Sequence, residues 1–181
     1  MKCENTDIRG LYIIEPDVFG DNRGWFMETY SHKKYKDLGI DTVFIQDNKS
    51  FTAAEGTIRG MHFQTGRYCQ SKLVSCARGR ILDVAADLRK DSPTYMKWTA
   101  VELSADNKKQ FFIPKGFAHG FLSLTDNVEV EYKVDEYYAP GHEGSIRYDD
   151  PDLAIEWGSI TPILSDKDKK APYLSQIQLD F

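Results

Sequence analysis

Gly56-Thr57-Ile58-Arg59-Gly60-Met61-His62-Phe63-Gln64 is the stretch of sequence that decides the fold. Apolar residues flank His62, which predicts a β-strand with the histidine on one face and Met61 and Phe63 on the other. A second isolated histidine, His119, lies in the Gly/Pro-containing segment 113–120. Two strands that each offer one polar ring predict a small β-barrel whose polar interior holds one small ligand.

Short apolar or alternating segments continue this pattern along the chain. They predict strands at 11–14, 43–46, 72–77, 80–88, 98–103, 110–113, 117–124 and 128–134. One helix is predicted at Ser31–Leu38, with Ser31 as its N-cap and Gly39 after its end. From Asp149 onward, proline and charge indicate short helical turns that wrap the barrel. Strands this short and closely spaced predict an all-β sandwich or barrel.

The length and composition indicate one globular domain over residues 1–181. Hydrophobic residues make up 41% and charged residues 28%, as is usual for such proteins. The net charge of -5 argues against a nucleic-acid partner, although a few arginines could still bind a small anion. No apolar run approaches the ~18 residues that a membrane helix needs, so we expect no membrane partner.

Cysteine usage and the N-terminal segment predict a cytoplasmic protein. Cys3, Cys69 and Cys76 are an odd number without CxxC spacing, which disfavours a disulfide framework or a zinc site. Residues 1–7 are polar and lack the apolar region of a signal peptide.

Several side chains have the chemistry of an acid–base site. A buried histidine next to a carboxylate can act as a general base near neutral pH, and His62 is the candidate. Lys72 and Asp83 lie on predicted strands that could neighbour it. A lysine can stabilise an oxyanion, and Tyr132 could deliver a proton from another strand. Taken singly, each of these residues is more often a packing or surface residue than a catalytic one.

A metal site is disfavoured by the spacing of the histidines. Metal-binding barrels of the cupin type often carry a His-x-His pair, a carboxylate and a later histidine. Here His62 is followed by Phe63 and Gln64, so only the later histidine, His119, remains. Two histidines on separate strands supply too few ligands for a first-row metal. We therefore expect no metal.

A tight turn is predicted at residues 21–24, Asp-Asn-Arg-Gly, before an alternating segment that carries Glu28. The turn could be a plain surface hairpin. It could also present Arg23 to a phosphate, with Arg59 as a second contact.

Together, these segments resemble the dTDP-4-dehydrorhamnose 3,5-epimerase family from about Gly10 to about Pro172. The motifs in chain order are Asp21-x-Arg23-Gly24-x-Phe26-x-Glu28, Gln46-Asp47-Asn48-x-Ser50, Arg59-Gly60-Met61-His62-Phe63-Gln64, Lys72-Leu73-Val74, Gly79-x-x-x-Asp83-Val84, Asp87-Leu88-Arg89-x-x-Ser92-Pro93-Thr94-Tyr95, Ile113-Pro114-x-Gly116-Phe117-Ala118-His119-Gly120-Phe121, Tyr137-Tyr138-Ala139-Pro140-x-x-Glu143, Asp150-Pro151-x-Leu153-x-Ile155-x-Trp157 and Leu164-Ser165-x-Lys167-Asp168.

The resemblance implies a cupin-type jelly-roll β-barrel without cofactor that works as a homodimer on a dTDP-linked 4-keto-6-deoxyhexose. It implies His62 as the base, Asp168 as its carboxylate partner, Lys72 at the enolate oxygen and Tyr132 as the acid on the opposite side. The positions that match binders of nucleotide, diphosphate or sugar are Arg23, Glu28, Gln46, Asn48, Arg59, His119, Tyr138, Glu143 and Lys167.

The expected reaction explains these residue types. A proton on a carbon next to a ketone can be removed to give an enolate, and C3 and C5 both flank the C4 ketone. One oxyanion site can therefore serve both carbons, with a base and an acid on opposite faces of the sugar. We expect inversion of C3 and C5 of dTDP-4-dehydro-6-deoxy-D-glucose, a step toward dTDP-L-rhamnose and surface polysaccharide.

Other functions are compatible with parts of the pattern. A mono-epimerase at C3 or C5 would share His62, Lys72 and Tyr132, and a related enzyme could use another nucleotide. A non-catalytic sugar-nucleotide-binding barrel would be expected to lack the base or the acid, and a metal-dependent cupin oxygenase would need the absent His-x-His pair. The chain departs from the family pattern at residues 65–69, at Met61 and Phe63, and at residues 145–148.

Overall fold

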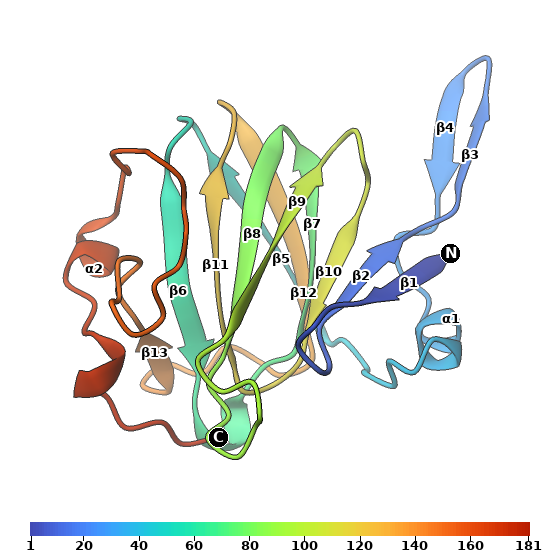
Figure 1. The fold of residues 1–181 in the computed structure, drawn as a ribbon. Coiled ribbons are helices and arrows are strands. Elements are labelled where there is room, and N and C mark those ends of the chain that lie inside the picture. Colours follow the sequence, from blue (N-terminus) through green and yellow to red (C-terminus); the bar gives the residue numbers. More distant parts are fainter.

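Two antiparallel β-sheets face each other and form the body of the protein (Figure 1). The computed structural model describes residues 1–181. Sheet 1 has the strand order β1-β2-β10-β7-β12-β5, and sheet 2 has the order β13-β6-β11-β8-β9. The all-β prediction is confirmed, and the non-sequential order of neighbouring strands is compatible with a jelly roll.

The strands are short, and the helices are few. Sheet 1 contains β1 Lys2–Asn5, β2 Tyr12–Glu15, β5 Gln46–Thr52, β7 Lys72–Arg78, β10 Gln110–Ile113 and β12 Val128–Val134. Sheet 2 contains β6 Ile58–Gln64, β8 Arg80–Asp87, β9 Trp98–Ser104, β11 Phe117–Ser123 and β13 Glu143–Ser145. Outside the sheets lie the hairpin strands β3 Val18–Asp21 and β4 Gly24–Met27, the helices α1 His32–Asp37 and α2 Asp166–Lys169, and the 3₁₀ turns η1 Gly66–Tyr68 and η2 Leu174–Gln176. No helix in the chain has the length and apolar character needed to cross a membrane.

Three apolar clusters hold the layers together because the strands alternate their side chains between two faces. The largest cluster lies between the sheets and includes Val74, Phe111 and Val130. A second cluster lies on the outer face of sheet 2, where the segment that follows Asp149 packs over it. A third joins α1 to the outer face of sheet 1 through Tyr35 and Phe112. The C-terminal segment therefore covers the sandwich with short turns, as predicted.

The prediction of a strand at residues 43–46 is wrong, because the strand in this region lies further along the chain. The strand begins at Gln46 and runs to Thr52, and it pairs with β12 over its whole length. Val43 and Ile45 precede it and are exposed. Alternate residues of β5, including Asn48 and Ser50, lie opposite Tyr132 and Val130 of β12 on the face toward sheet 2. Because this inner face is polar, β5 lacks the apolar alternation by which a strand is predicted.

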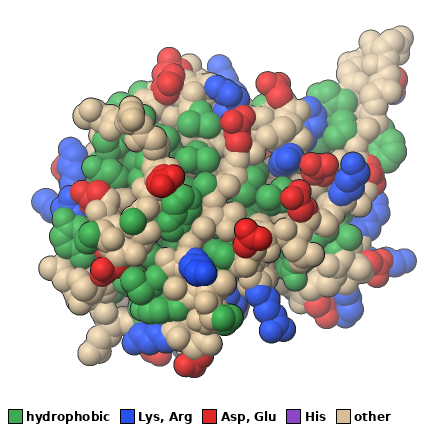
Figure 2. Space-filling model, in the orientation of Figure 1, with side chains coloured by type: hydrophobic (Ala, Val, Ile, Leu, Met, Phe, Trp, Pro, Cys, Tyr) green, Lys and Arg blue, Asp and Glu red, His purple; other side chains and the backbone are tan.

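The predicted turn at residues 21–24 joins β3 and β4 into a hairpin that projects away from the sandwich (Figures 1 and 2). Gly24 adopts φ +135°, a backbone conformation that favours glycine over residues with a side chain. The hairpin exposes three large aromatic side chains, Phe19, Trp25 and Phe26.

Candidate active site

A cavity between the two sheets gathers most of the candidate side chains. Its volume is about 590 Å³, within the usual range for a small-molecule site. Sheet 2 contributes Arg59, His62 and His119, sheet 1 contributes Lys72 and Tyr132, and the C-terminal segment contributes Lys167 and Asp168. An adjoining hollow of about 170 Å³ shares His62, Lys72, Tyr132 and Lys167 with the cavity and adds Tyr138 and Glu143.

His62 and Asp168 form a hydrogen-bonded pair at one wall of the cavity. His62 Nε2 lies 2.7 Å from Asp168 Oδ1. The neighbours Met61 and Phe63 point to the outer cluster of sheet 2, so the alternation of β6 places His62 on the inner face as predicted. Ser165 caps α2, accepts a hydrogen bond from the Asp168 backbone N–H and donates its hydroxyl to Asp168 Oδ2 at 2.9 Å.

His62 and Ser165 stabilise the negative charge of Asp168. Burial alone raises the pKa of the Asp168 carboxyl, but the hydrogen bonds and charge of His62 and the hydroxyl of Ser165 outweigh it. The pKa therefore lies below its ordinary value, and the carboxylate is ionised beside the imidazole. An ionised carboxylate holds the histidine ring in one orientation and stabilises its protonated form.

Two glycines allow β6 and β11 to approach closely next to His62. A Cβ on Gly60 would lie 2.5 Å from Gly120 Cα, and a Cβ on Gly120 would lie 2.9 Å from Arg59 O. In the same stretch the β6–β11 register shifts between His119 and Phe121. The two glycines thus allow the close strand spacing at which Arg59 and His62 line the cavity.

Lys72 and Tyr132 reach the cavity from the facing sheet. Lys72 Nζ lies 5.4 Å from the centre of the Tyr132 ring and 3.2 Å from Gln70 Oε1. Burial lowers the pKa of Lys72 to about 8, although the carboxylates of Asp135 and Asp83 act in the opposite direction. Burial also raises the pKa of Tyr132, so its phenol keeps its proton at neutral pH.

His119 pairs with Asp83, whose strand was predicted as one that could neighbour His62. His119 Nε2 lies 2.7 Å from Asp83 Oδ1, and Asp83 is fully buried. The reason is the strand order, because β11 lies between β6 and β8. Burial raises the pKa of Asp83 against the opposing effect of His119. Two carboxylate–histidine pairs thus occur at the cavity, and their histidines lie on the adjacent strands β6 and β11.

The remaining charged residues of the cavity lie toward its rim. Arg59 donates from Nε to Thr52 Oγ1 and from Nη2 to Phe51 O, both at 2.9 Å, so two of its five N–H donors are engaged. Lys167 Nζ lies 3.3 Å from Glu143 Oε2. A hydrogen bond to Glu143 raises the pKa of Tyr138, whose ring is largely exposed.

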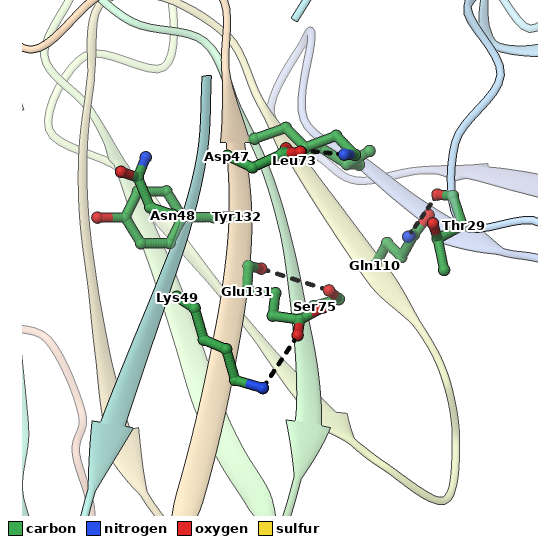
Figure 3. Close-up of a pocket in the computed structure, with 10 residues that line it drawn as sticks. Thr29, Asp47, Asn48, Lys49, Leu73, Ser75, Gln110, Glu131 and Tyr132 are labelled. Carbon is green, nitrogen blue, oxygen red and sulfur yellow. Dashed lines mark hydrogen bonds and ion pairs between the residues drawn. The ribbon is translucent and has the colours of Figure 1, made fainter. Parts of the chain in front are cut away.

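Asn48 and Tyr132 lie on one face of sheet 1, as Figure 3 shows, and they are direct partners across β5 and β12. Thr29 and Gln110 lie on the other side of the sheet and line a pocket of about 310 Å³ that shares only Tyr132 with the cavity. Gln46 donates to Asn48 Oδ1 at 2.8 Å.

Arg23 and Glu28 lie outside the cavity. Arg23 is on the projecting hairpin, where its guanidinium binds Asp21, and its side chain is 85% exposed. Glu28 follows the hairpin and pairs with Lys34 at 2.9 Å. The structure therefore places nine of the other eleven candidate residues around the cavity and its adjoining hollow. Asn48 and Gln46 line neither, but they lie next to Tyr132 and Tyr138.

The geometry suits the movement of protons at a carbon atom. A histidine with an ionised carboxylate partner stands on one sheet, and a phenol and a partly buried lysine stand on the other. Such a combination can supply a base, an acid and a cation to one small molecule.

The family model for dTDP-4-dehydrorhamnose 3,5-epimerase matches residues 5–176. The chain belongs to the dTDP-4-dehydrorhamnose 3,5-epimerase family. A relative of that name from Salmonella typhimurium is 48% identical over 176 residues, which cover 96% of each chain. The crystal structure of an epimerase of this family from Bacillus anthracis, with TDP and PPi bound, is 48% identical with a TM-score of 0.93 and covers 96% of this chain and 99% of that one.

A further family structure is the epimerase of Legionella pneumophila in complex with dTDP-4-keto-L-rhamnose. It is 46% identical with a TM-score of 0.93, and the match covers 99% of this chain and 97% of that one. The recognised resemblance is therefore confirmed over nearly the whole chain.

Some residues of this family site were not predicted from the sequence. Ser165 positions Asp168, and its signal was present in the Ser165-x-x-Asp168 spacing, a usual N-cap pattern. Phe121 and Ser50 line the cavity because they face inward on β11 and β5. No group of three His, Cys, Asp or Glu side chains is arranged to hold a metal ion.

Proposed function

We propose that this chain is an isomerase that inverts C3 and C5 of dTDP-4-dehydro-6-deoxy-D-glucose to give dTDP-4-dehydro-L-rhamnose. The observation that carries the proposal is the placement of the His62–Asp168 pair on one side of the cavity and of Lys72 and Tyr132 on the other. Family membership supports the same reaction, because the relatives carry the name of this activity.

In the proposed mechanism, His62 removes the proton from C3 or C5, and Asp168 stabilises the imidazolium that forms. The electron pair of the broken C–H bond moves into the ring and places negative charge on the C4 oxygen. The Lys72 ammonium stabilises that oxyanion, which is worth more in a buried site than in water. Tyr132 then returns a proton to the opposite face of the same carbon. The reaction moves protons without a change of oxidation state, so these residues suffice without a cofactor.

The rim residues are proposed to hold the nucleotide part of the substrate. Arg59 and Lys167 supply positive charge for the diphosphate, since guanidinium and ammonium groups pair well with phosphate oxygens. Tyr138 offers an exposed ring beside Glu143 for the nucleoside end. His119 lines the cavity, where its ring can contact the sugar, and Asn48 lies on the same face of sheet 1 as Tyr132. Gln46 bonds both Asn48 and Tyr138 N and is proposed to act beside them.

We further propose that the active form is a homodimer and that Arg23 and Glu28 act in the site of the second copy. In one chain the hairpin projects away from the sandwich (Figure 1), and none of its residues lines the cavity. The exposed Phe19, Trp25 and Phe26 give the hairpin an apolar surface that would be buried against a partner. A twofold arrangement would then place each Arg23 at the cavity of its partner.

Proton NMR of the candidate substrate with the protein in D₂O tests the reaction. Deuterium entering at both C3 and C5, with formation of the L-rhamno ketosugar, is expected. His62→Ala should abolish exchange at both carbons, and exchange that survives near the wild-type rate would contradict the single-base mechanism. Deuterium at one carbon alone would indicate a mono-epimerase. No exchange would reject the proposed substrate, and other nucleotide sugars would then be assayed.

A further inference from the structure

The side chain of Gln64 is occupied by the main chain of two different loops. Its Nε2 donates to Tyr68 O at 2.7 Å and to Tyr137 O at 3.2 Å. Its Oε1 accepts from Ala139 N at 2.8 Å. Gln64 is the last residue of β6 and is 6% exposed. Because both of its N–H donors are used, none remains for a bound ligand.

The two hydrogen bonds to residues 137 and 139 bracket Tyr138. The peptide group between Tyr137 and Tyr138 is held at both ends, since its C=O accepts from Gln64 and its N–H donates to Gln46 Oε1 at 3.3 Å. Gln46 begins β5 of sheet 1, whereas Gln64 ends β6 of sheet 2. Two glutamines from facing sheets thus clamp a segment outside the regular strands.

The clamped residue is the one with an exposed ring at the rim of the site. Tyr138 is 53% exposed and lines the hollow that also contains His62 and Glu143. A ring on an unrestrained loop would lose conformational freedom when it stacks on a ligand, and that loss would weaken binding. A backbone that is already fixed avoids this cost.

We propose that Gln64 is a positioning residue that pre-organises Tyr138 to bind the nucleotide end of the substrate. The inference rests on the proposed function. Gln64 acts on affinity through Tyr138 and takes no part in proton transfer, since its carboxamide bonds to loop main chain while His62 is held by Asp168. Loss of the clamp should therefore weaken binding of the substrate and of dTDP and leave the chemical step nearly unchanged.

Gln64→Met is the first test, because methionine has similar length and no hydrogen-bonding amide. We expect KM for the nucleotide sugar and Kd for dTDP to rise about tenfold, with kcat within about twofold of wild type. Gln64→Glu, which keeps an acceptor for Ala139 and loses both donors, serves as a second variant if Gln64→Met fails to fold. Gln176→Met is the matched control, because Gln176 is exposed and its side chain bonds only Tyr173 N. It should leave both constants unchanged.

A double-mutant cycle with Tyr138→Ala separates positioning from direct contact. If Gln64 acts through Tyr138, adding Gln64→Met to Tyr138→Ala should weaken dTDP binding by less than twofold. Fully additive losses, or a fall in kcat with unchanged KM, would overturn the inference. The wild-type assay is the separate test of the proposed function, because an inactive wild type would reject the reaction and not the clamp.

Amide hydrogen exchange tests the clamp without any substrate. In Gln64→Met, the amides of Tyr138 and Ala139 should exchange at least about tenfold faster, while the amides of β12 keep their protection. Unchanged protection of residues 138 and 139 would show that Gln64 does not hold this segment, whatever the enzyme's reaction is.

Discussion

His62 Nε2 and Asp168 Oδ1 lie 2.7 Å apart, although 106 residues separate them in the sequence. Local features on both sides produce this contact. On β6, the alternation of side chains turns His62 away from the apolar cluster, and the close approach of Gly60 to Gly120 sets the path of the strand. On α2, the cap formed by Ser165 fixes the turn that carries Asp168.

Asp168→Asn should lower kcat about 10²-fold with little change in KM. An amide cannot stabilise the imidazolium as a carboxylate does, so the base becomes weaker in the transition state. Steady-state kinetics with the nucleotide sugar gives both constants. Ser165→Ala is the graded control, because it removes the hydroxyl that bonds the carboxylate and caps α2 but keeps the carboxylate itself, and it should have a smaller effect. An Asp168→Asn enzyme with wild-type kcat would remove Asp168 from the mechanism.

Tyr132→Phe should separate proton abstraction from inversion. The phenylalanine keeps the ring next to Lys72 and loses only the hydroxyl, so His62 can still remove a proton and return it to the same face. Deuterium should therefore enter the substrate in D₂O while formation of the inverted product slows by about 10² or more. NMR follows both signals in one sample. Equal loss of exchange and inversion would mean that Tyr132 does more than deliver the proton.

Activity should fall as pH rises through about 8, the pKa to which burial brings Lys72. Deprotonation removes the positive charge that stabilises the enolate oxygen. Lys72→Arg, whose guanidinium stays charged, should lack this alkaline loss even if its maximal rate is lower. A pH profile of kcat/KM for both proteins checks the expectation, and an unchanged alkaline limb in Lys72→Arg would assign the loss to another group.

Above about pH 8, the contribution of Lys72 to the free energy of unfolding should rise while the activity falls. The pKa of Lys72 is about 8 in the folded protein and ~10.4 in an unfolded chain, so the unfolded state binds more protons between these values. The contribution of this group to the free energy of unfolding therefore rises with pH over that interval. Loss of activity above pH 8 would then not reflect unfolding caused by Lys72, and thermal melting at pH 7.5 and 9 can verify this.

The local alternation of apolar residues in the sequence was enough to predict many of the strands. Apolar alternation placed β10 and β12 at their observed bounds and put His62 on the inner face of β6. The same rule failed for β5, because its inner face is polar and lines the cavity. A strand that serves a polar site thus loses the signal by which strands are found.

Contacts between side chains that are far apart in the sequence could not be predicted from the local sequence pattern. Asp83 was predicted on a strand that could neighbour His62, but in the observed strand order Asp83 pairs with His119. Asp168 entered only through the family resemblance, because no short-range feature links the C-terminal turn to β6. Gln64 lay within a recognised motif, yet its role depends on loops that meet it only in the folded chain.

Arg23→Glu and His62→Ala should each inactivate the enzyme, and a mixture of the two chains should recover activity. In one chain Arg23 lies on the hairpin of β3 and β4 and does not line the cavity that holds His62. If each cavity receives the hairpin of its partner, a mixed dimer has one site with both wild-type residues and one with neither. Random pairing of equal amounts then restores about a quarter of the wild-type sites.

Co-expression of the two variants with different affinity tags, followed by tandem purification, isolates the mixed dimer for assay. Trp25→Ser with Phe26→Ser should weaken assembly by removing apolar surface from the hairpin, and analytical ultracentrifugation would show the shift toward monomer. No recovery in the purified mixed dimer would mean that Arg23 does not act across the interface. A monomeric wild-type protein with full activity would reject the shared site altogether, since a single chain leaves Arg23 outside the cavity.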